Sequence, residues 1–188
     1  MDNLWFANGV VLSPNEDFVV VSDLGRSKID KFWLKTAKAG ESETFVDSLP
    51  GVPDNITPDK NGIWVALPMT ADPQNPNLAH SMAPLPLVRK FQVRLISLID
   101  LLFTTIDSIL PNDFCKFVAS QVGSADSVKF LNPTRATILR IDWNGNIIAA
   151  YHSFDGAVYT HVLELDGHLY LGSISHDYIA KIVRRVHL

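Results

Sequence analysis

Several features that would point directly to a function are scarce in this sequence. Its single cysteine, Cys115, cannot form an intrachain disulfide, so the disulfide framework of a small secreted scaffold is excluded. Lysine and arginine number 16 against 20 aspartates and glutamates, which gives a formal net charge of -4. Because no excess of positive charge is available to neutralise phosphates, we expect no nucleic-acid partner.

Long apolar runs are also lacking. The first residues carry neither the basic nor the apolar segment of a secretory signal. The most apolar stretch, 87–110, is interrupted by Asp100 and Asp107, and its uninterrupted runs fall short of the roughly 20 residues that cross a bilayer. We therefore expect no targeting signal within these residues, either because the protein is cytosolic or because its natural beginning lies upstream of Met1.

What the sequence does contain is enough apolar material for a core and a repeat of short strands. Hydrophobic residues make up 47% of the chain and charged residues 19%, which excludes a disordered tail. The same order of residues occurs twice. An apolar run follows Asn8 and Ser13-Pro14, and a second apolar run follows Asn55 and Thr57-Pro58. The two Ser/Thr-Pro pairs are 44 residues apart, and a four-stranded propeller blade takes roughly 40 to 50.

Two turn signals predict hairpins in the last third of the chain. Asn144-Gly145 and Asp166-Gly167 each separate two apolar runs, and such dipeptides supply the positive φ that tight turns require. Short strands are thus predicted over 1–68 and again over 134–188. A β-sandwich also spaces short strands evenly and stays an alternative, but it does not require Asn and Ser/Thr-Pro at the same phase of successive units.

The middle of the chain, 69–133, breaks the strand pattern. A proline-rich loop is followed by a predicted helix over 87–110, in which polar residues recur at steps of three and four. One interpretation is that this helix packs on the sheets or on a neighbouring helix over 114–121. The other is that it lies in a membrane interface, with Arg89, Lys90 and Arg94 facing anionic headgroups.

The motifs around these strands resemble a known family. Residues 6–14, 29–35, 38–43, 49–56 and 165–173 are similar to segments in the carboxyl-terminal part of the strictosidine synthase-like family, in its animal branch. The resemblance implies a six-bladed β-propeller, which needs about 270 residues or more. We therefore expect an all-β fold: an incomplete six-bladed propeller of about two to three blades, with a helical insertion.

The same resemblance implies a calcium site. In the related paraoxonases and gluconolactonases, oxygen ligands from successive blades hold calcium in the central channel, as suits a cation that takes six to eight oxygen ligands. Asn8, Asp54 and Asn55 match those ligands. The alternative is that Asn8 forms a turn and that Asp54 and Asn55 cap a loop. The remaining family ligands would lie upstream of Met1.

The resemblance also limits the chemistry. The glutamate that strictosidine synthase uses as its general acid/base is replaced by Thr160, so we expect no strictosidine synthase activity. Glu164 is out of register and is interpreted as an ordinary strand residue, and His176 as a structural histidine or a channel residue. The implied activity is arylesterase-like or lactonase-like hydrolysis of small esters, with no catalytic residue assigned.

Two other interpretations stay open. The chain could belong to a non-catalytic, membrane-associated propeller that acts as a binding module, or it could be a truncated chain without activity of its own, because an incomplete ring exposes two sheet edges. For a full-length parent we expect a location at a membrane or in the secretory pathway, through 87–110 or an amino-terminal anchor upstream of Met1.

Overall fold

The fold consists of three antiparallel β-sheets and a separate pair of helices. A computed structural model describes residues 2–71, 85–122, 135–154, 156, 158–174 and 176–183. Contacts divide the chain into two compact units, of which the first, 1–77 with 133–188, holds the sheets and the second, 78–132, holds the helices. The predicted partial β-propeller with a helical insertion is therefore confirmed.

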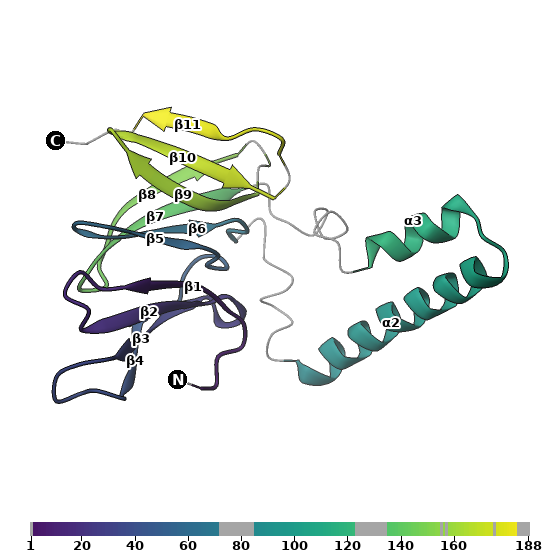
Figure 1. The fold of residues 1–188 in the computed structure, drawn as a ribbon, viewed down its shortest axis with the longest axis horizontal. Helices are drawn as coiled ribbons and strands as arrows, with labels where there is room; N and C mark the ends of the chain where they lie inside the picture. The colour runs from purple at the N-terminus through teal and green to yellow at the C-terminus, as the bar shows by residue number, and fades with distance from the viewer. Residues whose placement is uncertain are drawn as a thin grey trace. The chain divides into compact units, whose positions relative to one another are not determined.

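Each sheet is a meander of neighbouring strands, and the three sheets stack face to face (Figure 1). The first contains β1 (Ala7–Leu12), β2 (Phe18–Asp23), β3 (Lys28–Trp33) and β4 (Ser42–Val46), with a short 3-10 helix, η1 (Leu24–Arg26), between β2 and β3. The second contains β5 (Ile56–Asp59), β6 (Gly62–Leu67), β7 (Ala136–Asp142) and β8 (Ile147–Ser153). The third contains, among the described residues, β9 (Tyr159–Leu165), β10 (His168–Ser173) and β11 (Ala180–Val183).

The second sheet is the centre of the core because both of its faces are covered. Strand β6 is buried along its whole length, as expected for a continuous apolar strand between two layers. Ile63, Val65 and Leu67 pack toward the first sheet, in the same cluster as Val11 and Phe45. Trp64 and Ala66 pack toward the third sheet, against residues such as Tyr159, Val162 and Leu169. Side-chain alternation along one strand thus joins the three blades.

The second sheet combines two strands that precede the helical insertion in the sequence with two strands that follow it. Strands β6 and β7 pair from Gly62 with Asp142 to Leu67 with Thr137, although 85–122 lies between them in the sequence. The sequence predicted separate strand regions over 1–68 and 134–188, and the structure adds that one blade is shared between them. Apolar periodicity indicates that a strand exists but does not specify its partner.

The two predicted turns differ in detail. Asp166 and Gly167 both have positive φ, 48° and 72°, as a two-residue hairpin turn between β9 and β10 requires. At the β7–β8 turn only Gly145 has positive φ, 89°. That turn is longer because the Asp142 carboxylate accepts hydrogen bonds from the amides of Asn144 and Asn146.

The helical unit consists of α2 (Pro86–Ile109) and α3 (Asp113–Gln121), close to the predicted ranges. The Asn112 side chain caps α3 by accepting from the amide of Cys115 at 2.9 Å. Asp107 of α2 accepts from the amide of Asn112, which fixes the turn between the helices. Among the described residues, neither helix is long and apolar enough to cross a membrane.

Candidate functional site

The predicted ligand residues lie at the beginnings of neighbouring inner strands. Asn8 is the second residue of β1, and Asp54 and Asn55 directly precede β5. Strand β5 contacts both β1 and β9, so the first residues of three strands from three sheets meet here. The sequence separates Asn8 from Asp54 by 46 positions, and the propeller arrangement brings them together.

The three predicted side chains converge on one carboxylate oxygen. Asn8 Nδ2 donates to Asp54 Oδ1 at 2.7 Å, and Asn55 Nδ2 donates to the same oxygen at 3.2 Å. Asn55 Nδ2 also donates to the main-chain carbonyl of Thr160 on β9, at 3.0 Å. We call Asn8, Asp54 and Asn55 the inner-strand cluster. It joins all three sheets through side chains.

The main chain of the cluster is held from three directions. The amide of Asp54 donates to the carbonyl of Ala66 on β6, and the amide of Asn55 donates to the carbonyl of Thr160. The fully buried Ser22 hydroxyl donates to the carbonyl of Asp54 at 2.9 Å and accepts from the amide of Gly9 at 2.7 Å. The backbone that carries the cluster is therefore fixed by β2, β6 and β9.

Gly9 allows the close approach of β1 to β5. A Cβ atom at this position would lie 2.6 Å from the amide nitrogen of Ile56, closer than real Cβ contacts. Because that neighbour is backbone, it cannot rotate away as a side chain would. The glycine after Asn8 is thus required by packing between the strands that bear the cluster.

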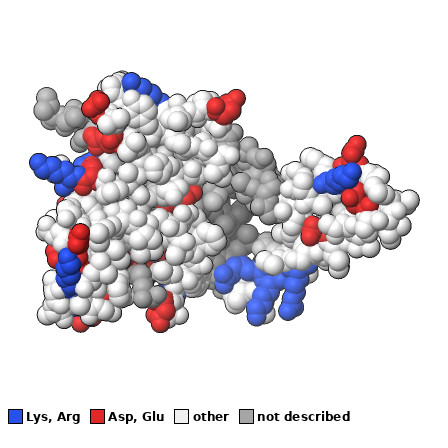
Figure 2. Space-filling model, in the orientation of Figure 1, with Lys and Arg blue, Asp and Glu red and all other residues white. Residues whose placement is uncertain are grey.

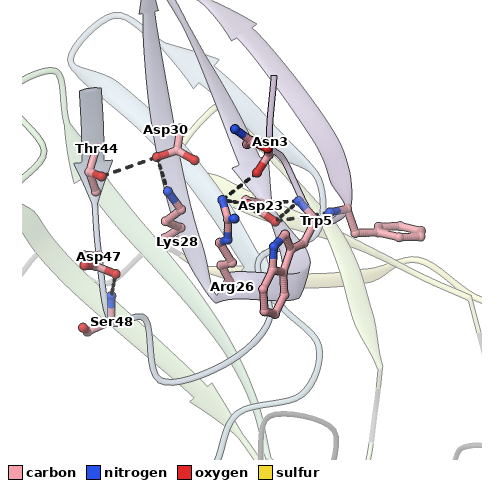
Figure 3. A network of polar contacts seen from close by, with 10 residues as sticks. Asn3, Trp5, Asp23, Arg26, Lys28, Asp30, Thr44, Asp47 and Ser48 are labelled. Atoms are coloured by element: carbon pink, nitrogen blue, oxygen red, sulfur yellow. Dashed lines mark hydrogen bonds and ion pairs between the residues drawn. The ribbon is translucent and has the colours of Figure 1, made fainter. Parts of the chain in front are cut away.

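A buried aspartate fixes the segment that leads into β1. Asp23, with a fully buried side chain, accepts from the amides of Trp5 and Phe6 (Figure 3). Arg26 pairs with Asp23 at 3.6 Å, donates to the carbonyl of Asn3 and lies over the Trp5 ring. These contacts set the direction in which the chain enters β1 and reaches Asn8.

The electrostatics of the cluster centre on Asp54. Burial raises the pKa of this carboxyl above its ordinary value, while hydrogen bonds from Asn8 and Asn55 and the charge of His161 oppose the rise. A half-buried carboxylate that has lost part of its hydration favours a bound cation, since a cation replaces the lost solvation.

The donor set fits a hard cation in part. Asp54 supplies a carboxylate, and Asn8 and Asn55 supply amide oxygens, the ligand types that calcium prefers. The hydrogen bonds above use the amide nitrogens, and the oxygens of the same amides are the potential ligands. Within the described residues, no group of three or more His, Cys, Asp or Glu side chains forms a metal site, so any cation site here depends on the amides.

Sequence reasoning missed one contact beside the cluster. Thr57 Oγ1 of β5 and His161 Nε2 of β9 lie 3.2 Å apart, next to the residues that hold Asn55. The sequence by itself assigns His161 no role at this site. The signal that could have found it is its place directly after Thr160, at the beginning of the third inner strand.

Other predicted positions have structural roles. Thr160 is buried, and its carbonyl holds Asn55, so its part here is main-chain support. Glu164 accepts from Trp64 Nε1 and from Arg140, both at 2.9 Å, so it joins the second and third sheets. Asp59 also pairs with Arg140. His176 packs against the Tyr178 ring, and its buried Nε2 has no hydrogen-bond partner among the described residues.

Comparisons with known proteins show which sequences this chain is similar to. The family model described as strictosidine synthase matches residues 1–37. The Drosophila melanogaster protein named adipocyte plasma membrane-associated protein Hemomucin is 47% identical over 184 residues, which cover 97% of this chain and 32% of that protein. The Bos taurus adipocyte plasma membrane-associated protein is 31% identical over 186 residues, covering 97% of this chain and 39% of that protein.

The chain thus spans about a third of the length of the curated relatives it matches. The similarity extends over both strand regions and the helical insertion, since it covers 97% of the chain. Together with three propeller blades whose inner strands meet at the Asn8 and Asp54-Asn55 motifs, these matches support a relationship of the chain to the strictosidine synthase-like family.

Proposed function

We propose that this chain contributes three propeller blades and part of a calcium site to a hydrolase of small esters or lactones. The observation that carries the proposal is the convergence of Asn8, Asp54 and Asn55, from two blades, on one half-buried carboxylate oxygen. Calcium takes six to eight oxygen ligands, so this cluster accounts for part of the coordination shell.

The chain's own residues would bind and orient the ion. Asp54 provides negative charge, and the two asparagines provide neutral oxygens beside it. Hydrogen bonds to the main chain of the cluster hold these ligands in place before the ion arrives: the Ser22 hydroxyl donates to the carbonyl of Asp54, and the amides of Asp54 and Asn55 donate to the carbonyls of Ala66 and Thr160. Bound calcium would supply a Lewis acid that polarises an ester carbonyl and stabilises the oxyanion.

Calorimetric titration of the chain with calcium tests the site. We expect binding that weakens at least about a hundredfold in the double variant Asn8→Ala, Asp54→Ala, because one charged and one neutral ligand are lost. The control is Asp47→Ala with Asn61→Ala, two exposed positions in the same unit. Equal calcium binding by the two double variants would rule out the inner-strand cluster as the site.

Hydrolysis of phenyl acetate by the full-length parent protein, with and without a calcium chelator, tests the activity separately. We expect hydrolysis that the chelator and the Asn8→Ala, Asp54→Ala variant both abolish. Calcium binding without hydrolysis would instead favour a non-catalytic binding module, a function consistent with Thr160 at the position of the family's catalytic glutamate.

The location of the protein belongs to the same proposal. The relatives in Drosophila melanogaster and Bos taurus are named plasma membrane-associated proteins. On that ground we propose that the parent of this chain lies at a membrane of the secretory pathway or cell surface. Fractionation of cells, followed by detection of the native protein in the membrane pellet or the soluble fraction, checks this placement.

A further inference from the structure

Helix α2 presents a continuous row of apolar side chains to solvent. Steps of three, four and seven residues place one row along a single face: Leu87, Phe91, Leu95, Leu98, Leu102 and Ile109. Leu87 is 78% exposed, Phe91 65% and Ile109 71%. No residue of this 24-residue helix is buried. An exposed apolar face of this length indicates a contact site for a membrane or for another protein.

Helix α3 covers a different side of α2. The Phe103 and Phe114 rings meet edge to face, with centroids 5.8 Å apart, and Phe103 is only half exposed. At 100° per residue, Phe103 lies about a quarter turn or more from the centre of the apolar row. Helix pairing therefore accounts for one edge of the apolar surface, and the described part of α3 does not cover the row itself.

Basic residues flank the row at one end of the helix. Arg89, Lys90 and Arg94 lie in the first turns, and the first acidic residue along α2 is Asp100. Figure 2 shows basic side chains gathered on the helical unit. At 100° per residue, Arg94 and Lys90 lie about 60° and about 100° from the centre of the row on one side, and Arg89 lies about 160° away, on the opposite face of the helix. Long cationic side chains beside an apolar face reach lipid headgroups while their stems stay in the apolar layer.

We propose that α2 lies flat in the interface of an anionic membrane, with its apolar row in the acyl boundary and Arg89, Lys90 and Arg94 at the headgroups. Charge complementarity selects this occupant, because three cations in the first turns of the helix, with no acidic residue before Asp100, suit an anionic surface. The arrangement is parallel to the bilayer, in agreement with a helix that is too polar to cross it. It is independent of the calcium site.

Vesicle sedimentation of the whole chain tests the proposal. We expect binding to vesicles of phosphatidylcholine and phosphatidylserine in equal amounts, and at least about tenfold weaker binding to phosphatidylcholine alone. The triple variant Arg89→Gln, Lys90→Gln, Arg94→Gln is expected to lose that preference. Added salt is expected to weaken the binding of the unchanged chain, since screening shortens the range of the attraction.

A matched pair of variants tests the apolar row. Phe91→Ser with Leu98→Ser is expected to weaken vesicle binding about a hundredfold, because two large side chains no longer enter the acyl boundary. The control is Ile147→Ser with Ile148→Ser, two exposed isoleucines of β8, which is expected to bind like the unchanged chain. Circular dichroism establishes that each variant keeps its helices.

Three outcomes would overturn the proposal. The first is absence of sedimentation with the phosphatidylserine vesicles. The second is an equal effect of the α2 pair and the β8 pair. The third is a marked fall in the unfolding midpoint of Phe91→Ser, Leu98→Ser without lipid, which would show that the row packs against protein.

Discussion

Nearly all of the buried apolar residues among those described lie in or beside the sheets, whereas no residue of helix α2 is buried. In the sheets, Trp64 and Ile63 are fully buried between layers, and polar groups such as Arg140 are paired where they enter the core. In α2, large apolar residues such as Leu87 and Leu98 face solvent. Similar hydrophobicity therefore serves folding in one region and, in our proposal, membrane contact in the other.

The largest test of this comparison is the removal of one large side chain from each region. Trp64→Ala is expected to reduce the free energy of unfolding by about 3–5 kcal/mol, because it leaves a cavity between two sheets. It also removes the hydrogen bond to Glu164. Leu98→Ala in α2 is expected to change the free energy of unfolding by no more than about 0.5 kcal/mol. Urea unfolding measures both. Similar losses would show that α2 is buried against protein.

An intermediate effect is expected from the cap between the helices. Asn112→Ala removes the side chain that accepts from the amide of Cys115 and is expected to weaken α3 by about 1 kcal/mol. Because the contacts divide the chain into two units, the sheets should not respond. Amide hydrogen exchange, followed separately in α3 and β6, measures this, with Ser120→Ala as the control. Faster exchange in β6 would contradict independent units.

The smallest effect concerns the charge of Asp54. Burial raises the pKa of this carboxyl in the folded chain, so the stability that it contributes is fully present below its ordinary pKa of 3.8 and is lost as the pH rises through the folded value. The Asp54→Asn variant has no ionisable group at this position. In calcium-free buffer the variant should therefore gain stability relative to the unchanged chain between acidic and neutral pH. A constant difference in unfolding midpoints across that range would contradict the buried charge.

Much of the fold could be predicted, because strands and helices have distinct periods. The buried run at Ile63–Ala66, the turn at Asp166-Gly167 and the two helices all follow from local patterns. The pairing of β6 with β7 could not be predicted, because pairing across an insertion leaves no local signal. The ion pair between Glu164 and Arg140 was missed because a contact between neighbouring sheets leaves no local signal either.

The candidate site was predicted from resemblance rather than from spacing. Nothing local in the sequence indicates that Asn8 meets Asp54, and only the family pattern suggested one site. The contact between Thr57 and His161 was missed, because threonine and histidine at strand beginnings carry no motif of their own. Long-range geometry, set by the stacking of blades, supplied both contacts.

The shared second sheet has a consequence for the order of folding. As the chain emerges from the ribosome, the first sheet is complete once β4 has been made, since its four strands are consecutive. The β5–β6 hairpin cannot pair with β7 until the whole helical insertion and β7 itself have been synthesised. During that interval one edge of the buried strand β6 is unpaired, a template for aggregation. The length of the insertion thus sets how long this edge stays unpaired during synthesis.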